Sequence, residues 1–323
     1  MYKEDKSRIV DIARELGLST ATVSNCINGK RNKVSKQTYK RVWNLLEERD
    51  YFPGKADLLL GQNDRKIIGI FVDDHPKYEG KVLQDPFICA IVNALVYEIE
   101  NNGYFNMLKL STKVEDIIKF STMWNMKGIV VVGFCAQDYQ ELREKMRIPF
   151  VIIDGECKQK GKFVNIMIDN YDGGVKAGTC FKERGYKSII CISDNLENVD
   201  KLRIDGLKSV YQKARVILVP MKKKERETFY NANINLFKNC DGIFCVSDFY
   251  ALELMKILKQ KKISKGIIGF DDVTLSEFMG LSTIRQNNAL RAKEALRLLN
   301  RLFNNEDIEH EVVLPVDLII RET

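Results

Sequence analysis

Short apolar stripes alternate with polar positions at helical spacing along the first fifty residues. The first stripe, with intervals of three and four residues, consists of Ile9, Ile12, Ala13 and Leu16. Gly17 follows where a helix end favours a left-handed residue, and the Ser19 hydroxyl can cap a second helix. Val23, Cys26 and Ile27 give that second helix a narrow apolar face. Two short helices joined this tightly predict a helix-turn-helix, whose second helix enters the major groove of DNA.

A third helix and a boundary follow. Ser35 is the expected N-cap of the third helix, whose apolar face would consist of Tyr39, Val42, Leu45 and Leu46. Pro53 stops a helix running into it, and residues 54–60 form a weakly helical segment. Gly61 and the polar residues after it mark the end of this small all-α region.

The chain after Arg65 has a different pattern, in which β-branched runs of strand length alternate with helical stretches. Such alternation predicts an α/β architecture with doubly wound parallel sheets. Strands are expected at 66–72, 104–110, 128–134, 150–153, 188–192, 215–219, 242–246, 266–269 and 312–323. Helices are expected at 87–101, 114–124, 139–146, 173–184 and 201–212. Roughly 260 residues exceed one comfortable core of ~150, so two lobes are expected.

Positive charge is concentrated at the N-terminus. Residues 1–61 hold 12 Lys and Arg against 8 Asp and Glu, whereas the net charge of the whole chain is +7. No acidic residue occurs between positions 16 and 46, a stretch that carries Lys30, Arg31, Lys33, Lys36, Lys40 and Arg41. Such a stripe suits the phosphate backbone of DNA. The alternative is a solvated basic face on an ordinary three-helix domain.

The N-terminal order resembles the lactose-repressor family of bacterial transcription regulators. The resemblance rests on Asp11-Ile12-Ala13, Gly17-Leu18-Ser19, Thr22-Val23-Ser24, Asn28, Val34-Ser35, Thr38, Arg41-Val42 and Tyr51-Phe52-Pro53. It implies a helix-turn-helix domain followed by a two-lobed, periplasmic-binding-protein-like core. It also implies a homodimer on palindromic operator DNA, with an effector bound between the lobes that controls DNA affinity.

This resemblance gives expected domain bounds. Residues 1–61 would form the helix-turn-helix domain, with a hinge at about 52–61, and residues 62–323 the two-lobed effector and dimerisation domain. Lobe 1 is expected at about 65–160 plus 285–311, and lobe 2 at about 163–283 plus 313–323. Crossings between the lobes are expected near 155–165, 282–290 and 309–316.

The resemblance also predicts the residues that contact DNA. Those of the two helices and their turns are Ser19, Thr20, Ala21, Thr22, Ser24, Asn25, Asn28, Lys30, Arg31, Lys33, Ser35 and Thr38; those of the hinge are Lys55 and Leu60. The chain departs from the family where Asn25 replaces a usual Arg, and Asn favours adenine whereas Arg favours guanine. The loop 28–34 is longer and more basic. In the hinge, Leu60 matches a leucine that enters the minor groove, whereas Asp57 and Leu58 depart from the family pattern.

Several core residues match effector positions of the family: Phe87, Arg203, Phe244, Ser247, Asp248 and Asp271, with Asp154 and Asp169 as weaker candidates. An arginine, carboxylates and an aromatic ring suit a sugar or a nucleoside. The alternative for each polar residue is a strand-end cap or a surface charge, and for Phe87 plain core packing.

Signals of other functions are weak. His75 and His310, the two histidines, lie in no recognisable nucleophile context, and the eight cysteines show no C-x-x-C pairing, so no catalytic residue, metal or cofactor is expected. The glycines at 173, 174 and 178 match no phosphate-binding fingerprint and favour close helix packing. No signal peptide or membrane-spanning run occurs, so a cytoplasmic protein is expected. The Lys222–Lys224 run is interpreted as a solvated loop or helix start.

Three function classes therefore remain. The leading hypothesis is a repressor of carbohydrate-related genes that responds to a sugar, or alternatively to a nucleobase or nucleoside. The second is a solute-binding protein for transport, which should carry a secretion signal and no basic N-terminal domain. The third is a sugar-processing enzyme, which should carry an acid–base pair or a cofactor loop.

Overall fold

The structure, a computed structural model, describes residues 9–27, 30–48, 65–134, 136–155 and 161–323. The chain divides into two compact units, Met1–Arg65 and Lys66–Thr323. Asn28 and the predicted hinge, including Lys55 and Leu60, lie outside the described residues.

The N-terminal unit is a bundle of short helices. Its elements are α1 (Ile9–Leu16), α2 (Thr20–Ile27), the 3-10 turn η1 (Arg31–Lys33) and α3 (Lys36–Glu48). Their shared core is made of Ile12, Ala13, Val23, Cys26, Ile27, Val42, Leu45 and Leu46. Gly17 has φ +66°, the left-handed turn that separates α1 from α2. The Ser19 hydroxyl accepts a hydrogen bond from Thr22 N at 3.1 Å, which caps α2 as predicted.

Lobe 1 of the core contains a six-stranded parallel sheet in the order β11-β5-β4-β3-β1-β2. Its strands are β1 (Ile67–Val72), β2 (Phe105–Leu110), β3 (Gly128–Val132), β4 (Phe150–Ile153), β5 (Phe163–Ile168) and β11 (Glu311–Leu314). Its helices are η2 (Pro76–Tyr78), η3 (Val82–Gln84), α5 (Pro86–Asn101), α6 (Val114–Met123), α7 (Ala136–Lys145) and α14 (Asn288–Phe303). Every residue of β1 is buried, which explains its continuous apolar run.

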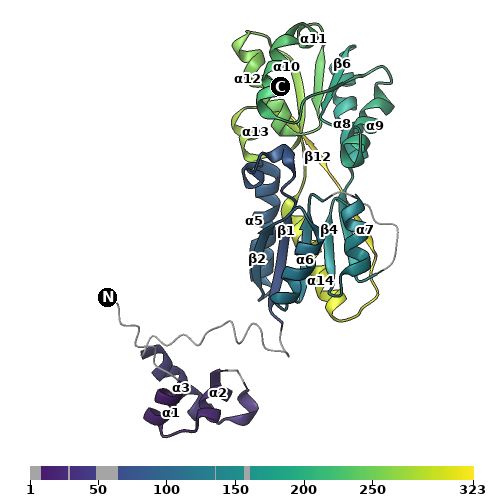
Figure 1. Cartoon of the computed structure of the whole chain (residues 1–323). Helices are drawn as coiled ribbons and strands as arrows, with labels where there is room; N and C mark the ends of the chain where they lie inside the picture. The colour runs from purple at the N-terminus through teal and green to yellow at the C-terminus, as the bar shows by residue number, and fades with distance from the viewer. Residues whose placement is uncertain (1–8, 28–29, 49–64, 135, 156–160) are drawn as a thin grey trace. The chain divides into compact units, whose positions relative to one another are not determined.

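Lobe 2 contains a second six-stranded sheet in the order β12-β10-β9-β8-β6-β7, in which only β12 runs antiparallel to its neighbour. Its strands are β6 (Ile189–Ser193), β7 (Arg215–Leu218), β8 (Gly242–Cys245), β9 (Gly266–Asp271), β10 (Ser282–Arg285) and β12 (Asp317–Ile319). Its helices are α8 (Asn170–Glu183), α9 (Asn198–Val210), α10 (Lys223–Ala232), α11 (Ile234–Lys238), α12 (Asp248–Gln260) and α13 (Thr274–Phe278). Figure 1 shows the two lobes of the core.

The chain crosses three times between the lobes, and the structure corrects two expectations here. The first crossing lies between β5 and α8, after residue 168, and not near 155–165, because β5 pairs with β4 and belongs to lobe 1. The expected single strand at 312–323 is two strands in different sheets, with the third crossing between β11 and β12. The second crossing lies between β10 and α14, within the expected range.

Glycines let two helices of lobe 2 touch through their backbones. A Cβ on Gly174 of α8 would clash with the carbonyl of Arg203, and one on Gly206 of α9 would clash with the carbonyl of Tyr171. The glycine-rich start of α8 therefore serves close helix packing, as predicted, and fixes α9 beside it.

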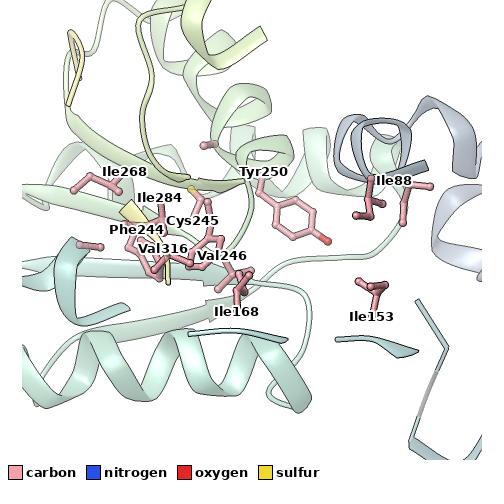
Figure 2. Packing of buried hydrophobic residues seen from close by; sticks show 14 of the residues in the cluster. Ile88, Ile153, Ile168, Phe244, Cys245, Val246, Tyr250, Ile268, Ile284 and Val316 are labelled. Carbon is pink, nitrogen blue, oxygen red and sulfur yellow. The ribbon is translucent and has the colours of Figure 1, made fainter. Parts of the chain in front are cut away.

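An apolar core extends through both lobes. Figure 2 shows part of it, with Phe244, Ile268 and Ile284 in lobe 2 and the ring of Tyr250 extending toward Ile88 of lobe 1. Among the described residues, no helix combines the length and apolarity that a bilayer span requires.

Candidate DNA-binding surface and effector site

The second helix of the N-terminal unit presents small and polar side chains to solvent. Thr20 and Ala21 are exposed, and Ser24 and Asn25 are partly exposed, whereas Val23 is fully buried. The helix therefore has one face for packing and one that is free to approach base edges. These base contacts remain predictions.

Two pairs of hydroxyls stabilise the helix starts of this unit. Ser19 Oγ and Thr22 Oγ1 lie 2.8 Å apart, and Ser35 Oγ and Thr38 Oγ1 are also 2.8 Å apart. Ser35 also accepts a hydrogen bond from Thr38 N at 3.0 Å, so it caps α3 as predicted. These four hydroxyls consequently have a structural use in addition to the DNA contacts predicted for them.

The turn after α2 and helix α3 carry exposed cations. Lys30, Lys33, Lys36 and Lys40 are exposed. Arg41 Nη2 donates to the Leu16 carbonyl oxygen at 3.3 Å, which holds α3 against the end of α1. Exposed lysines beside a polar helix face fit the predicted phosphate contacts.

Arg203 of α9 is held rigidly in lobe 2. Its Nε donates to Asn170 Oδ1 at 2.8 Å and its Nη1 to the Val246 carbonyl at 2.6 Å. The guanidinium carbon lies 3.7 Å from the centroid of the Phe270 ring, and Asp200 is 3.8 Å from Nη1. A guanidinium fixed this firmly is pre-organised to bind a ligand oxygen.

Asp271 ends β9 next to that ring. It is buried, and Gln286 Nε2 donates to its Oδ1 at 2.5 Å. Burial raises the pKa of Asp271 well above its ordinary range, although the charge of Arg203 opposes this. A ligand that donates a hydrogen bond to this carboxylate would favour its charged form.

The structure gives two predicted effector residues other roles. Asp248 is fully buried and accepts hydrogen bonds from Val273 N, Ser276 Oγ and Thr283 Oγ1 at 3.0, 2.7 and 2.6 Å. Its carboxylate therefore ties α12 to β10 and α13. Phe244 is fully buried in the middle of the lobe 2 sheet, within the apolar core (Figure 2), and its ring has no free face for a ligand. Both match effector positions of the family, and near a strand end the sequence alone does not distinguish a core side chain from an exposed one.

The remaining candidate effector residues differ in whether their side chains already have partners in the structure. Asp169 Oδ1 accepts a hydrogen bond from Asp172 N at 2.8 Å, so it caps α8 at the first crossing. Ser247 is partly exposed and precedes α12 without a side-chain capping bond. Asp154 forms an ion pair with Arg291, and the guanidinium carbon of Arg291 lies 5.7 Å from the centroid of the Phe87 ring. Phe87 and Asp154 therefore share one cationic neighbour.

Charged groups from both lobes interact where the lobes meet, a region we call the lobe junction. The charge of Asp85 in lobe 1 contributes to the raised pKa of Asp271 in lobe 2, where burial is the main cause. Asp194 and Asp200 in lobe 2 act on Lys77 of lobe 1, and raise its pKa against the effect of burial. The lobe junction thus holds carboxyl groups from both lobes, together with Lys77 and Arg203.

Cavities elsewhere do not involve the predicted residues. One of about 450 Å³ is lined by Gly185, Tyr186, Lys187, Asp241, Ser264, Lys265 and Gly266, on the side of lobe 2 where the strands begin. Within the described ranges, no group of three or more His, Cys, Asp and Glu side chains is arranged to hold a metal ion. Of the six cysteines in that part, five are buried and Cys89 is exposed.

Comparison with known proteins identifies both units. Residues 8–54 match the model of bacterial regulatory proteins of the lacI family, and residues 179–323 match a periplasmic binding protein-like domain. The chain belongs to the lacI family of bacterial regulatory proteins. This lacI-family chain is 26% identical to the HTH-type transcriptional regulator MalR of Clostridium butyricum over 98% of both chains. It is 27% identical to the HTH-type transcriptional repressor PurR of Vibrio atlanticus over 94% of both.

Solved structures confirm the fold of the lacI-family chain. A lac repressor dimer bound to operator and an anti-inducer matches with a TM-score of 0.83 at 18% identity, over 98% of both chains. The regulator CelR in complex with cellobiose matches with a TM-score of 0.69 at 19% identity, over 98% of this chain and 99% of that chain. As a lacI-family protein, this chain is a DNA-binding transcriptional regulator, which favours the first of the three function classes weighed above.

Sequence reasoning missed the polar residues that support the candidate site, chiefly Asn170, Gln286 and Arg291. Arg291 had a usable signal, because it is a cation at the start of the apolar stripe of α14, which continues with buried alanines and leucines. Asn170 and Gln286 had none, since an isolated amide beside a helix start occurs as often at the surface.

Proposed function

We propose that this regulator binds a palindromic operator as a homodimer through α2. A small molecule that binds at the lobe junction lowers or raises its affinity for that operator. The regulator is not an enzyme in this proposal, and because the operator lies on the chromosome it acts in the cytoplasm. The pre-organised pair of Arg203 and Asp271 carries the proposal. Arg203 is fixed by two hydrogen bonds and stacked on Phe270, the residue that precedes Asp271.

A sugar is the effector class that fits this pair best. A fixed guanidinium donates to sugar oxygens, a carboxylate accepts from sugar hydroxyls, and Phe87 offers a ring face for C–H surface. Solved relatives include complexes with cellobiose, D-xylulofuranose and ribose. The PurR relatives keep a nucleobase or nucleoside as the alternative.

The charge of the lobe junction narrows the class further. Asp85, Asp200 and Asp271 all have a raised pKa with burial as the main cause. A phosphate group beside these buried carboxyls would raise their pKa values further, and the free energy of that like-charge interaction opposes phosphate binding. The proposed effector is therefore an unphosphorylated sugar.

A thermal-shift screen of the full-length protein tests the effector class. D-ribose, D-xylulose, cellobiose, ribose 5-phosphate, adenine and hypoxanthine would be compared, since a ligand at 100 times its Kd stabilises the folded state by about 2.7 kcal/mol. Stabilisation by an unphosphorylated sugar supports the proposal. Stabilisation by a nucleobase or a sugar phosphate alone would overturn the effector class.

A variant then tests the site. Asp271→Asn should weaken sugar binding about tenfold to a hundredfold, because a hydrogen bond to a charged group contributes about 1.5–3 kcal/mol. Asp317→Asn, at an exposed carboxylate on β12, is the matched control and should bind normally. Equal affinities for the two variants would remove Asp271 from the site.

Selection from random DNA tests the operator part independently. The enriched sequences should contain an inverted repeat, as expected when two copies of α2 follow the two-fold axis of a dimer. Enrichment of single, unrepeated sites would contradict the dimer, and a lack of enrichment would contradict specific DNA binding.

A further inference from the structure

A chain of three hydrogen bonds connects lobe 2 to lobe 1 through the second crossing. Gln286 Nε2 donates to Asp271 Oδ1 at 2.5 Å, and Arg291 Nη1 donates to Gln286 Oε1 at 2.7 Å. Arg291 Nη2 in turn donates to Asp154 Oδ1. Asp271 ends β9 in lobe 2, whereas Asp154 follows β4 in lobe 1, so the two ends of this chain belong to different lobes.

The direction of every bond in the chain is fixed by chemistry. A guanidinium can only donate, so Gln286 must turn its oxygen toward Arg291 and its amino group toward Asp271. A displacement of Arg291 therefore moves the donor that Gln286 presents to Asp271. The reverse also holds, because linkage between two sites is reciprocal.

Three of the four residues in this chain of hydrogen bonds are shielded from water. Arg291 is 0% exposed, Gln286 5% and Asp271 7%. A broken bond here could not be replaced by a water molecule without rearrangement, because unpaired buried polar groups are costly. The four residues are therefore expected to move together.

Two observations indicate that this chain of hydrogen bonds has more than one arrangement. Asp154 and Asp271, its two ends, both have positive φ, at 59° and 130°. Non-glycine residues with such backbones are strained and cluster at ligand clamps and switch regions. In addition, Arg291 Nε is buried and has no acceptor among the described residues. The present arrangement thus leaves a donor unused that a second arrangement could satisfy.

Two residues in this chain of hydrogen bonds, Asp271 and Arg291, also belong to or contact the candidate effector site. Asp271 is itself the carboxylate proposed to bind the sugar. The guanidinium carbon of Arg291 lies 5.7 Å from the centroid of the Phe87 ring, which is the proposed platform for the ligand. A ligand that settles between them would act on the chain at two points.

We propose that Arg291 is a positioning residue that couples effector binding to the arrangement of the two lobes. It acts through Gln286 on Asp271 in lobe 2 and through its ion pair on Asp154 in lobe 1. This inference rests on the proposed function, because it assigns the effector to Asp271. Packed elements of this kind switch between discrete arrangements and do not deform continuously.

Hydrogen–deuterium exchange of the full-length, unliganded protein tests the connection without an effector. Asp154→Gly removes the acceptor in lobe 1, and glycine suits the positive φ at this position. Exchange should accelerate roughly threefold to thirtyfold in lobe 2, in the peptide that spans the end of β9 and the crossing. Arg291→Met should produce the same change, and the double variant should add little.

A control on the same helix separates this effect from general loosening. Arg301 of α14 forms an exposed ion pair with Glu306 at 2.8 Å, and Glu306→Gln should leave exchange in lobe 2 unchanged. A change confined to lobe 1 in Asp154→Gly would overturn the proposal. If Arg291→Met does not fold, Arg291→Lys replaces it, since lysine keeps the charge but cannot bridge two acceptors as a planar fork.

A second readout uses the sugar and the DNA site that the screens above identify. The ratio of DNA affinities without and with sugar should move toward one in Arg291→Met by about fivefold or more. A loss of sugar affinity with an unchanged ratio would overturn the coupling role. Failure of the sugar screen would refute the proposed effector class alone, because the exchange experiment needs no ligand.

Discussion

Replacing Asp73 by asparagine should stabilise the protein at neutral pH. Asp73 follows the carboxyl end of β1 in the lobe 1 sheet, and its pKa is raised from 3.8 to about 6. Burial is the main cause, and the neighbouring charges of Asp138 and Asp74 add to it. Asparagine keeps the size of the side chain and removes the charge that these surroundings disfavour.

The size and the pH dependence of the effect follow from this shift. A displacement of about two pKa units corresponds to about 3 kcal/mol, which partial exposure to water reduces to about 1–2 kcal/mol. Because the folded-state pKa lies above the unfolded value, the folded protein binds this proton more tightly than the unfolded chain. The Asp73 carboxylate therefore destabilises the fold most above about pH 6, and the penalty disappears as the pH falls below about 4.

Urea unfolding followed by circular dichroism between about pH 4 and pH 8 measures the difference. Asp73→Asn should exceed the parent protein in free energy of unfolding at high pH and converge with it at low pH. Asp241→Asn is a control of opposite sign. Asp241 Oδ2 accepts hydrogen bonds from the backbone N–H groups of Lys187 and Ser188, both at 2.8 Å, and these lower its pKa. That variant should lose stability at neutral pH and keep the same loss down to about pH 4, because the pKa of Asp241 lies below its ordinary value of 3.8.

A pH-independent difference between Asp73→Asn and the parent protein would refute the reasoning. It would mean that the variant acts through packing and not through the proton. Equal pH slopes for Asp73→Asn and Asp241→Asn would refute it as well, since burial and hydrogen bonding act on a carboxyl pKa in opposite directions.

Three further predictions concern helix packing and DNA. Gly174→Ala should lower the free energy of unfolding by about 1–3 kcal/mol or more in the same urea assay, because its new methyl group clashes with the α9 backbone. The control Gly185→Asn, at a left-handed position with open surroundings, should change that free energy little. Equal losses of stability in the two variants would contradict the contact. Asn25→Ala should relax base preference at one position of each half-site in sequence selection, and an unchanged motif would remove Asn25 from the base contacts. Substituting Lys30 and Lys33 together by alanine should reduce the slope of log Kd against log salt by about 4, because each of the two subunits loses two phosphate contacts, and an unchanged slope would exclude those contacts.

The sequence predicted most of the fold because periodicity reports burial directly. The run from Ile67 to Val72 is apolar at every position, and all six residues are buried. No strand was expected at β5 (Phe163–Ile168), and the first crossing was placed before it. Its pairing with β4, and with β11 far along the chain, assigns it to lobe 1. Which sheet a strand joins depends on such contacts, and no local pattern records them.

The candidate site could be predicted only in part. Arg203 and Asp271 were selected by resemblance, and the structure supplies the partners that hold them. Asp248 was selected on the same grounds, but its carboxylate is occupied by three donors from α13 and β10. The sequence names the carboxyl groups at strand ends, whereas the direction of each side chain depends on packing between distant elements.

The three crossings determine when each part of this protein can fold during synthesis. The helix-turn-helix is built from contacts within residues 9–48 and can form as soon as it leaves the ribosome. Lobe 1 begins at β1, but its sheet is completed only when β11 (Glu311–Leu314) pairs with β5, long after β5 has been synthesised. Both lobes therefore need strands beyond residue 310, so a nascent chain that stops before β11 would display a folded DNA-binding unit without the complete core that regulates it.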